Sequence, residues 1–379
     1  MFAKRTRWDL TPNELSKRRA ALEKRGVRIL DLTDSNPTRM GIQYPEALLA
    51  SLAHPAGGTY DPDPRGLCRA REAVASIFAA KGTPLSPERI ILTASTSEAY
   101  SHLFRLLADP EDEILVPRPS YPLFDYLADL NDVRAVSYRL DDWDSIERAV
   151  TPRTRAVVAV HPNNPTGSCL SRHDLERLGR FCREHALVLI ADEVFAEYRW
   201  ESSPDFPETL LAAEAPLVFA LGGLSKFMGL PQMKLAWIAC AGLPDRVEEA
   251  LARLEVIADT YLSPNTPVQN AFPGWLAFAP EIQRQIRSRL QENLHFLQQT
   301  LRTSVCRVLP VQGGWNAVLH LPALEDEEAW VIDLLENENV VVYPGYFFDF
   351  GNPGFLVVSL LTPLDLFQEG VRRLLKRVK

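Results

Sequence analysis

Short apolar runs alternate with longer segments of helical period between residues 88 and 240. Each run is four or five residues long and rich in Val, Ile and Leu, so we expect buried parallel strands joined by helices. Apolar stripes at helical spacing lie between runs, in residues 99–107 and 175–182. This pattern predicts an α/β fold with a mostly parallel sheet flanked by helices. The expected strands are 89–93, 113–116, 156–160, 187–190 and 217–221.

The pattern changes after a loop expected at 261–267. A polar helix is predicted over 281–300, followed by short strands near 305–309, 317–321 and 355–360. This mixture predicts a smaller α+β domain. The expected division is an N-terminal segment packed on the small domain, a large domain, and a small C-terminal domain, over residues 1–45, 46–265 and 266–379.

Composition excludes several classes of protein. The chain has 379 residues and a formal charge of −8, so it offers no basic field for nucleic acid or anionic lipid. Its five cysteines are widely spaced without a CxxC pair, and its seven histidines lack ligand spacing, which argues against disulfides and metal sites. We find no secretory signal and no apolar stretch of membrane-spanning length. A cytoplasmic protein is expected.

Polar segments follow four predicted strands, at the edge where open α/β sheets bind ligands. Ser95, Thr96 and Ser97 precede a helix, where hydroxyls and backbone N–H groups could hold a phosphate. The alternative is a simple helix cap. Asn164 lies in a loop, 161–167, in which two X-Pro steps disfavour helix and could aim its amide. The alternative there is an ordinary turn.

The other two segments carry charges. Asp192 ends a very apolar strand and needs a partner, which a cationic ring nitrogen would provide, unless it caps the next helix. Lys226 lies in a Gly-rich, apolar stretch, with Lys234 eight residues later. Burial and a second ammonium would both lower the pKa of Lys226, giving an amine able to form a Schiff base. The alternative is a solvated surface lysine.

In order and spacing, these segments resemble those of the class I and II aminotransferases, which are fold type I pyridoxal-phosphate enzymes. The resemblance covers nearly the whole chain. It implies that Lys226 binds pyridoxal 5'-phosphate as an aldimine, that Asp192 pairs with the pyridine nitrogen, and that transamination proceeds through a ketimine. The matching motifs are 60–66, 95–99, 119–122, 164–167, 192–193, 225–226, 313–314 and 344–345.

The resemblance also implies roles for other residues. Asn164 would bond the ring O3′ and Tyr121 would stack on the ring. Tyr60 would reach the phosphate of the partner subunit in a homodimer. The freed amine of Lys226 would carry a proton from the substrate Cα to C4′. The phosphate would be held by Ser95, Thr96, Ser97, Ser225 and Lys234.

Several positions depart from the family pattern. Phe195 replaces a tyrosine that bonds O3′, and Gly223 and Lys234 replace a serine and an arginine at the phosphate. Val357 stands where an arginine normally clamps the substrate carboxylate. Arg39, next to Asn36 in a segment that lines the family's substrate pocket, is a candidate replacement, or else a surface arginine. An aromatic lining or plain core packing would explain Trp315, Asn316, Tyr346, Phe347 and Phe348.

The expected substrates are an amino acid or other amine and a keto acid. The alternative on the same scaffold is a decarboxylase, β-lyase or oxidase, because Val357 leaves the carboxylate contact open. A cofactor-binding sensor would need a DNA-binding segment, for which the chain leaves no room. A nicotinamide dehydrogenase would need a GxGxxG turn, and the sequence contains none.

Overall fold

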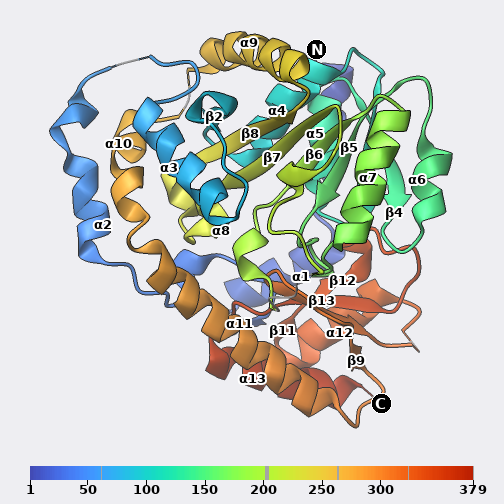
Figure 1. Cartoon of the computed structure of the whole chain (residues 1–379). Coiled ribbons are helices and arrows are strands. Elements are labelled where there is room, and N and C mark those ends of the chain that lie inside the picture. Colours follow the sequence, from blue (N-terminus) through green and yellow to red (C-terminus); the bar gives the residue numbers. More distant parts are fainter. Residues whose placement is uncertain (61, 201–204, 263, 323, 379) are drawn as a thin grey trace.

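A seven-stranded sheet forms the centre of the protein (Figure 1). β8 runs antiparallel to both of its neighbours and the other neighbouring pairs are parallel, in the order β2-β8-β7-β6-β5-β3-β4. The computed structural model describes residues 1–60, 62–200, 205–262, 264–322 and 324–378. The predicted α/β fold is confirmed. The strands are β2 (Ile90–Thr93), β3 (Glu113–Arg118), β4 (Arg134–Arg139), β5 (Thr154–Val160), β6 (Val188–Asp192), β7 (Leu217–Gly223) and β8 (Ala236–Gly242).

All five strands predicted for this sheet are present, and the sheet contains two more, β4 and β8. β4 lies at the sheet edge with most of its side chains exposed or half-buried, so it carries arginines in place of an apolar run. β8 is mostly buried, but it begins just after the lysine-bearing segment and contains small residues such as Ala236, Ala239 and Gly242. Neither strand therefore has the apolar, branched signature by which the others were predicted.

Helices cover both faces of the sheet. On one face, α4, α5 and α9 pack against strand residues such as Val158 and Ile190, and on the other face α3 and α7 pack against Val157 and Leu189. Burial on both faces explains why these strands read as continuous apolar runs. The helices of this region are α2 (Glu46–Ala50), α3 (Cys68–Ala80), α4 (Thr96–Leu107), α5 (Leu123–Leu130), α6 (Trp143–Ala149), α7 (Arg172–Glu184), α8 (Leu224–Phe227), α9 (Pro244–Tyr261) and α10 (Thr266–Trp275).

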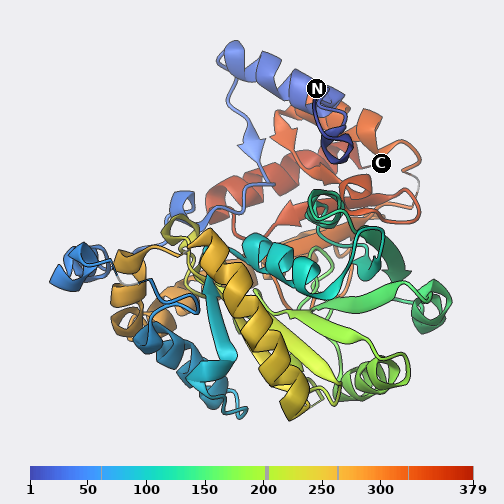
Figure 2. The ribbon, with the colours of Figure 1, turned by 90° about the horizontal axis from the view of Figure 1, so that it is seen from above.

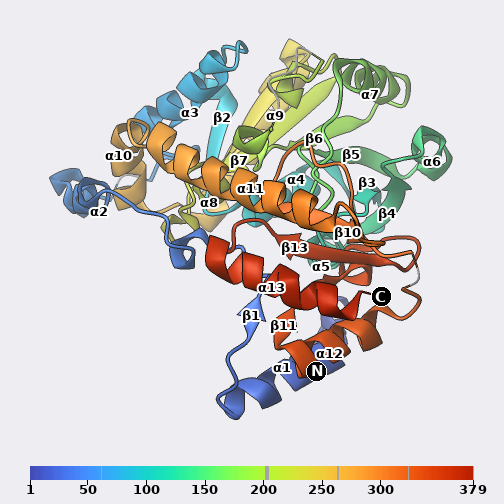
Figure 3. The same ribbon diagram turned by 90° about the horizontal axis from the view of Figure 1, so that it is seen from below.

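A second, antiparallel sheet follows in the order β12-β13-β10-β9. The long helix α11 runs beside α13 and reaches from the large domain, where Gln283 donates to Phe227 O, to this sheet (Figure 3). The predicted polar helix and the three predicted strands are all present here. These elements are α11 (Ala279–Leu301), β9 (Arg307–Val308), β10 (Asn316–His320), α12 (Glu327–Glu338), β12 (Tyr343–Pro344), β13 (Phe355–Ser359) and α13 (Leu364–Arg377).

The N-terminal segment joins this C-terminal region. β1 (Leu30–Asp31) pairs in parallel with β11 (Val340–Val341). The first long helix, α1 (Glu14–Lys24), lies against α12, and Figure 2 shows it among the orange and red C-terminal elements. The backbone N–H of Ser359 donates to Leu32 O over 2.6 Å, so the segment is also tied to β13.

The five cysteines are all unpaired. Within the described ranges, no three or more His, Cys, Asp or Glu side chains gather as a group that could hold a metal ion. No helix in the described part of the chain is long and apolar enough to cross a membrane.

Candidate active site

The carboxyl ends of β5, β6 and β7 meet at one edge of the large sheet. In the strand register Val160 pairs with Asp192, and Asp192 pairs with Leu221. Asn164 follows β5 by four residues, and Lys226 follows β7 through the short helix α8. Three of the four predicted polar segments are therefore brought together by neighbouring parallel strands, as expected for an open α/β sheet.

The amine of Lys226 is surrounded by aromatic rings. Its Nζ lies 4.8 Å from the ring centroid of Trp315 and 5.5 Å from that of Phe195. Burial lowers the pKa of Lys226 to about 8, and the negative charge of Asp192 opposes this shift. We expected Lys234 to lower this pKa as well; instead Lys234 is exposed and burial alone causes the decrease.

Asp192 accepts hydrogen bonds at both carboxylate oxygens. The Tyr100 hydroxyl donates to Oδ2 over 2.9 Å, and the Val194 N–H donates to Oδ1 over 3.1 Å. Burial raises the pKa of Asp192, while these two bonds and the charge of Lys226 lower it. The bond to Val194 closes a local turn and does not cap the next helix, whose N-cap residue is Phe195. Tyr100 was not predicted as a site residue. The sequence feature that could have identified it is its place in the helix that follows the hydroxyl residues.

The Asn164 amide is held by a residue from the second sheet. Asn316 Nδ2, on β10, donates to Asn164 Oδ1 over 2.7 Å. Tyr121 lies after β3, and its phenol has a pKa raised by burial, with further increases from the charges of Asp192 and Tyr343. The charge of Asp192 therefore raises the pKa of the Tyr121 phenol and opposes the lowering of the Lys226 pKa by burial.

The hydroxyl residues at the start of α4 act as a helix cap. Ser95 Oγ accepts from the N–H of Glu98 over 3.1 Å, so the capping alternative is realised for Ser95. Thr96 and Ser97 begin the helix and are half-buried. Ser225, in α8, is also half-buried.

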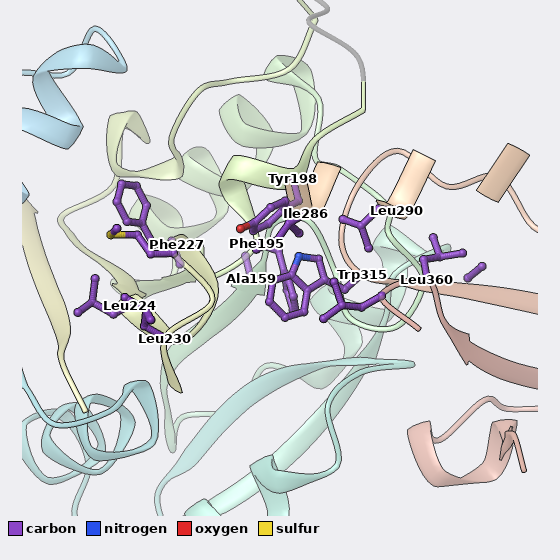
Figure 4. Packing of buried hydrophobic residues seen from close by; sticks show 14 of the residues in the cluster. Ala159, Phe195, Tyr198, Leu224, Phe227, Leu230, Ile286, Leu290, Trp315 and Leu360 are labelled. Carbon is purple, nitrogen blue, oxygen red and sulfur yellow. The ribbon is translucent and has the colours of Figure 1, made fainter. Parts of the chain in front are cut away.

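Trp315 fills the space between the two sheets near Lys226. It is almost fully buried and packs edge-on against Phe195 and Tyr198, with centroids 5.5 and 5.2 Å away. Figure 4 shows these rings together with Ile286 and Leu290 of α11. The Tyr198 hydroxyl donates to the Lys226 carbonyl over 2.8 Å, which fixes the backbone that carries the lysine.

Position 357 is apolar on the face of β13 that carries the polar contacts. Val357 pairs with Val318, and two residues further Ser359 pairs with Asn316, so all four side chains share one face. Val357 is fully buried beside Val318 and Phe348.

The remaining predicted residues lie further out. Asn36 Oδ1 accepts from the N–H and hydroxyl of Thr38, in a local turn, and Arg39 is exposed. Tyr60 is 71% exposed. Asp61 of the motif that begins at Tyr60 lies outside the described residues, as does Ser263 of the predicted loop.

Known proteins match this chain over most of its length. The family model for aminotransferase class I and II matches residues 31–374. A glutamate-pyruvate aminotransferase, AlaA, of Escherichia coli K12 is 29% identical over 362 residues, 91% of this chain and 89% of that protein. An alanine aminotransferase of Mycobacterium tuberculosis is 29% identical over 369 residues, 92% of this chain and 85% of its own length.

Solved structures agree with these sequence matches. The alanine aminotransferase from Pyrococcus furiosus has a TM-score of 0.90 and 26% identity, covering 99% of both chains. An aminotransferase from Escherichia coli has a TM-score of 0.88 and 25% identity, covering 98% of this chain and 96% of that one. The predicted enzyme class, one that transfers amino groups, is confirmed. This chain belongs to the class I and II aminotransferase family.

Proposed function

We propose that this aminotransferase uses pyridoxal 5'-phosphate, bound covalently to Lys226 and paired through its ring nitrogen with Asp192. The observation that carries the proposal is the juxtaposition of an amine of lowered pKa and a carboxylate of raised pKa at adjoining strand ends. The family to which the chain belongs depends on this cofactor. The strand-end placement of both groups supports the same roles here.

The carboxylate of Asp192 fits a cationic ring. Its two hydrogen bonds come from neutral donors, Tyr100 and Val194, and burial still raises its pKa. A ring N–H⁺ would supply the positive charge that a half-buried carboxylate lacks. When bound, the cofactor's protonated ring serves as an electron sink for the pair released at the substrate Cα.

Lys226 fits two tasks. With a pKa of about 8, part of its amine is neutral at pH 7, and the neutral amine is the form that attacks an aldehyde. Once a substrate amine has taken its place, the freed amine stays tethered near the site and can take the proton from the substrate Cα. The bond from Tyr198 to the Lys226 carbonyl keeps the lysine backbone in position during both tasks.

The cofactor phosphate would bind at the N-terminus of α4. We assign it to the hydroxyls of Ser95, Thr96, Ser97 and Ser225 and to the charge of Lys234. The N–H groups and the dipole of a helix N-terminus favour an anion. Tyr121 would stack on the ring, and Asn164 would donate to the ring O3′.

The assembly would be a homodimer in which Tyr60 reaches the phosphate of the partner subunit. Its 71% exposure leaves the phenol available for a second chain. We place the enzyme in the cytoplasm, where its five unpaired cysteines stay reduced. The division into 1–45, 46–265 and 266–379 is proposed on the packing of α1 on α12 and the pairing of β1 with β11.

The substrates would be an amino acid and a keto acid, with glutamate, alanine and pyruvate as the first to test because they name the relatives. Asn36 and Arg39 lie in the N-terminal segment that is tied to β13, and we assign them to the substrate side of the site. The test of the function is an absorbance titration of the purified protein with single amino donors, without a keto acid.

The lysine-bound cofactor is expected to give a yellow absorbance band. An amino donor should remove this band while one equivalent of keto product forms. A persistent band with release of ammonia, carbon dioxide or a thiol would instead assign a lyase, decarboxylase or oxidase. Lys226→Ala should abolish the borohydride-reducible adduct. Lys226→Arg keeps the positive charge but removes the nucleophile, so it should abolish the adduct as well. An adduct in either variant would show that the anchor lies elsewhere.

A further inference from the structure

The hydrogen bond between Asn316 and Asn164 joins the two sheets at the site. Asn316 Nδ2 on β10 donates to Asn164 Oδ1 in the loop after β5, over 2.7 Å. We propose that Asn316 is a positioning residue that holds the Asn164 amide with its N–H₂ turned toward the phenolic oxygen of the cofactor. This inference rests on the proposed function, because it concerns the same cofactor.

The backbones on either side hold the pair together. Gln312 N–H donates to Gly167 O over 3.0 Å, and Gly167 N–H donates to Asn163 O over 2.8 Å. Gly167 has a φ of 69°, and a Cβ there would lie 2.4 Å from Gly313 O. The loop that carries Asn164 and the segment that leads into β10 therefore touch with no room for a side chain. This close backbone contact between the two segments keeps Asn316 next to Asn164.

The bond couples the orientations of the Asn164 and Asn316 amides. A primary amide has a carbonyl that accepts and an N–H₂ that donates, and the two can exchange places by a flip. Turning Asn164 over alone would set two donors against each other, and turning both amides over would leave Asn164 Oδ1, an acceptor, facing the cofactor oxygen. With Oδ1 occupied, Nδ2 of Asn164 is the free group, and no acceptor for it is found among the described residues.

The surroundings of the site make this orientation important. At position 195 a phenol would have given the cofactor oxygen a second donor, but Phe195 has only a ring, which packs on Trp315. Asn164 is then the side chain left to donate to that oxygen. On the face of the second sheet that carries Asn316, Val318 and Val357 are apolar and buried. They cannot hold the Asn164 amide in the place of Asn316, and Ser359, opposite Asn316, accepts a hydrogen bond from the Ser35 hydroxyl instead.

The effect can be measured on the holoenzyme without turnover. A donor to the phenolic oxygen stabilises its negative charge, and thereby lowers the pKa of the ionisation that changes the absorbance of the bound cofactor. Asn316→Leu removes the donor that orients Asn164, so the midpoint of the absorbance titration should rise by about one pH unit. Asn316→Asp should raise it further, because a carboxylate turns the N–H₂ of Asn164 toward itself.

A matched control lies on the same strand. His320 is at the far end of β10 and stacks on Phe355, so His320→Ala should leave the midpoint unchanged. If Asn316→Leu reduces the yield of folded protein, Asn316→Ala provides the same test with a side chain that fits any available space. An unchanged midpoint in a folded Asn316 variant would overturn the proposal.

A double-mutant cycle separates positioning from direct contact. If Asn316 acts only through Asn164, adding Asn316→Leu to Asn164→Leu should shift the midpoint no further. Additive shifts would mean that Asn316 acts on the cofactor independently, and would overturn the positioning role. A wild-type protein that forms no yellow adduct would instead refute the proposed function itself. The two failures are therefore distinguishable.

Discussion

Two side chains next to the predicted motif residues complete the environment of Asp192 and Asn164. Tyr100 donates to the carboxylate and Asn316 donates to the amide. Tyr100 is nearly fully buried, and its pKa is raised well above the usual value, first by burial and then by the charge of Asp192. The phenol therefore stays protonated and remains a donor across the working pH range.

Removing this donor should weaken the hold on the cofactor. Tyr100→Phe leaves Asp192 with one fewer hydrogen bond, so the pKa of the carboxylate should rise and its pairing with a cationic ring should weaken. We expect the Kd for pyridoxal phosphate to increase about tenfold, the value of one hydrogen bond to a charged group. Equilibrium dialysis measures it. Tyr138→Phe is the control, because that buried phenol donates to a carbonyl, Val158 O; equal losses in both variants would contradict the role of Tyr100.

His161 should make the stability of the protein depend on pH. Its ring is fully buried, and burial lowers its pKa from 6.5 to about 3. Between pH 3 and pH 6.5 the unfolded chain binds a proton at His161 and the folded chain does not. The contribution of His161 to the free energy of unfolding therefore keeps its full value above pH 6.5 and decreases as the pH falls toward 3. At pH 5 the expected loss is about 2 kcal/mol.

Urea unfolding at pH 7 and pH 5 checks this expectation. His161→Asn should reduce the difference between the two pH values, whereas replacing the exposed His54 by Asn should leave it as in the wild type. A wild-type difference that His161→Asn does not reduce would show that other groups cause it.

Candidate site residues at strand ends could be predicted from the sequence. Residues of other helices and strands that contact them could not. Lys226, Asp192 and Asn164 could be located because an apolar run points directly at each. Tyr100 depends on the rotational phase of α4, and the role of Asn316 depends on how a distant strand docks. No local pattern specifies such contacts, since they arise only when the elements pack.

At the scale of elements, the strongest sequence signals were the strands buried on both faces. β5, β6 and β7 combine continuous apolar runs with burial, and their prediction is confirmed. Among the strands that were not predicted, β4 pairs along an exposed edge, and β1, β11 and β12 are only two residues long. Pairing with a neighbour, not composition, makes these segments extended.

The strand β13 offers a test of the missing carboxylate contact. Val357 is buried on the face that also presents Asn316 through its pairing with Ser359. Val357→Arg should lower the KM for glutamate or alanine about tenfold, because a bidentate guanidinium would meet the substrate carboxylate. It should also destabilise the free enzyme, since the charge is then unpaired.

Steady-state kinetics and thermal unfolding measure the two effects. Val357→Met is the matched control, because it adds length without charge and should not lower the KM. An unchanged KM in a folded Val357→Arg variant would mean that the carboxylate binds elsewhere, with Arg39 the next position to replace.

At the scale of the whole molecule, exposed apolar groups lie around Tyr60. Tyr60 and Leu262 border the same small cavity and are 71% and 63% exposed. Exposed apolar groups that cluster in this way are typical of surfaces that another chain covers. They support the proposed homodimer.

Hybrid dimers test whether Tyr60 serves the neighbouring site. Tyr60→Phe should raise the Kd for pyridoxal phosphate several-fold, because a hydrogen bond to a phosphate is lost. Lys226→Ala subunits bind no cofactor covalently but keep Tyr60. Mixing the two variants should restore wild-type affinity in one site of each hybrid dimer, measured by cofactor titration. Hybrids with unchanged weak binding would show that Tyr60 acts within its own chain.

The pairing of β1 with β11 has a consequence for the timing of synthesis. Lys226 and Asp192 leave the ribosome before Asn316, β11 and β13, which all follow them in the chain. Until those later elements emerge, β1 has no strand to pair with, Asn164 lacks its donor, and Trp315 cannot cover the lysine. In a nascent chain the Lys226 amine therefore lacks the burial that lowers its pKa, as well as the groups that orient its neighbours. The enzyme becomes competent only near the end of its own translation.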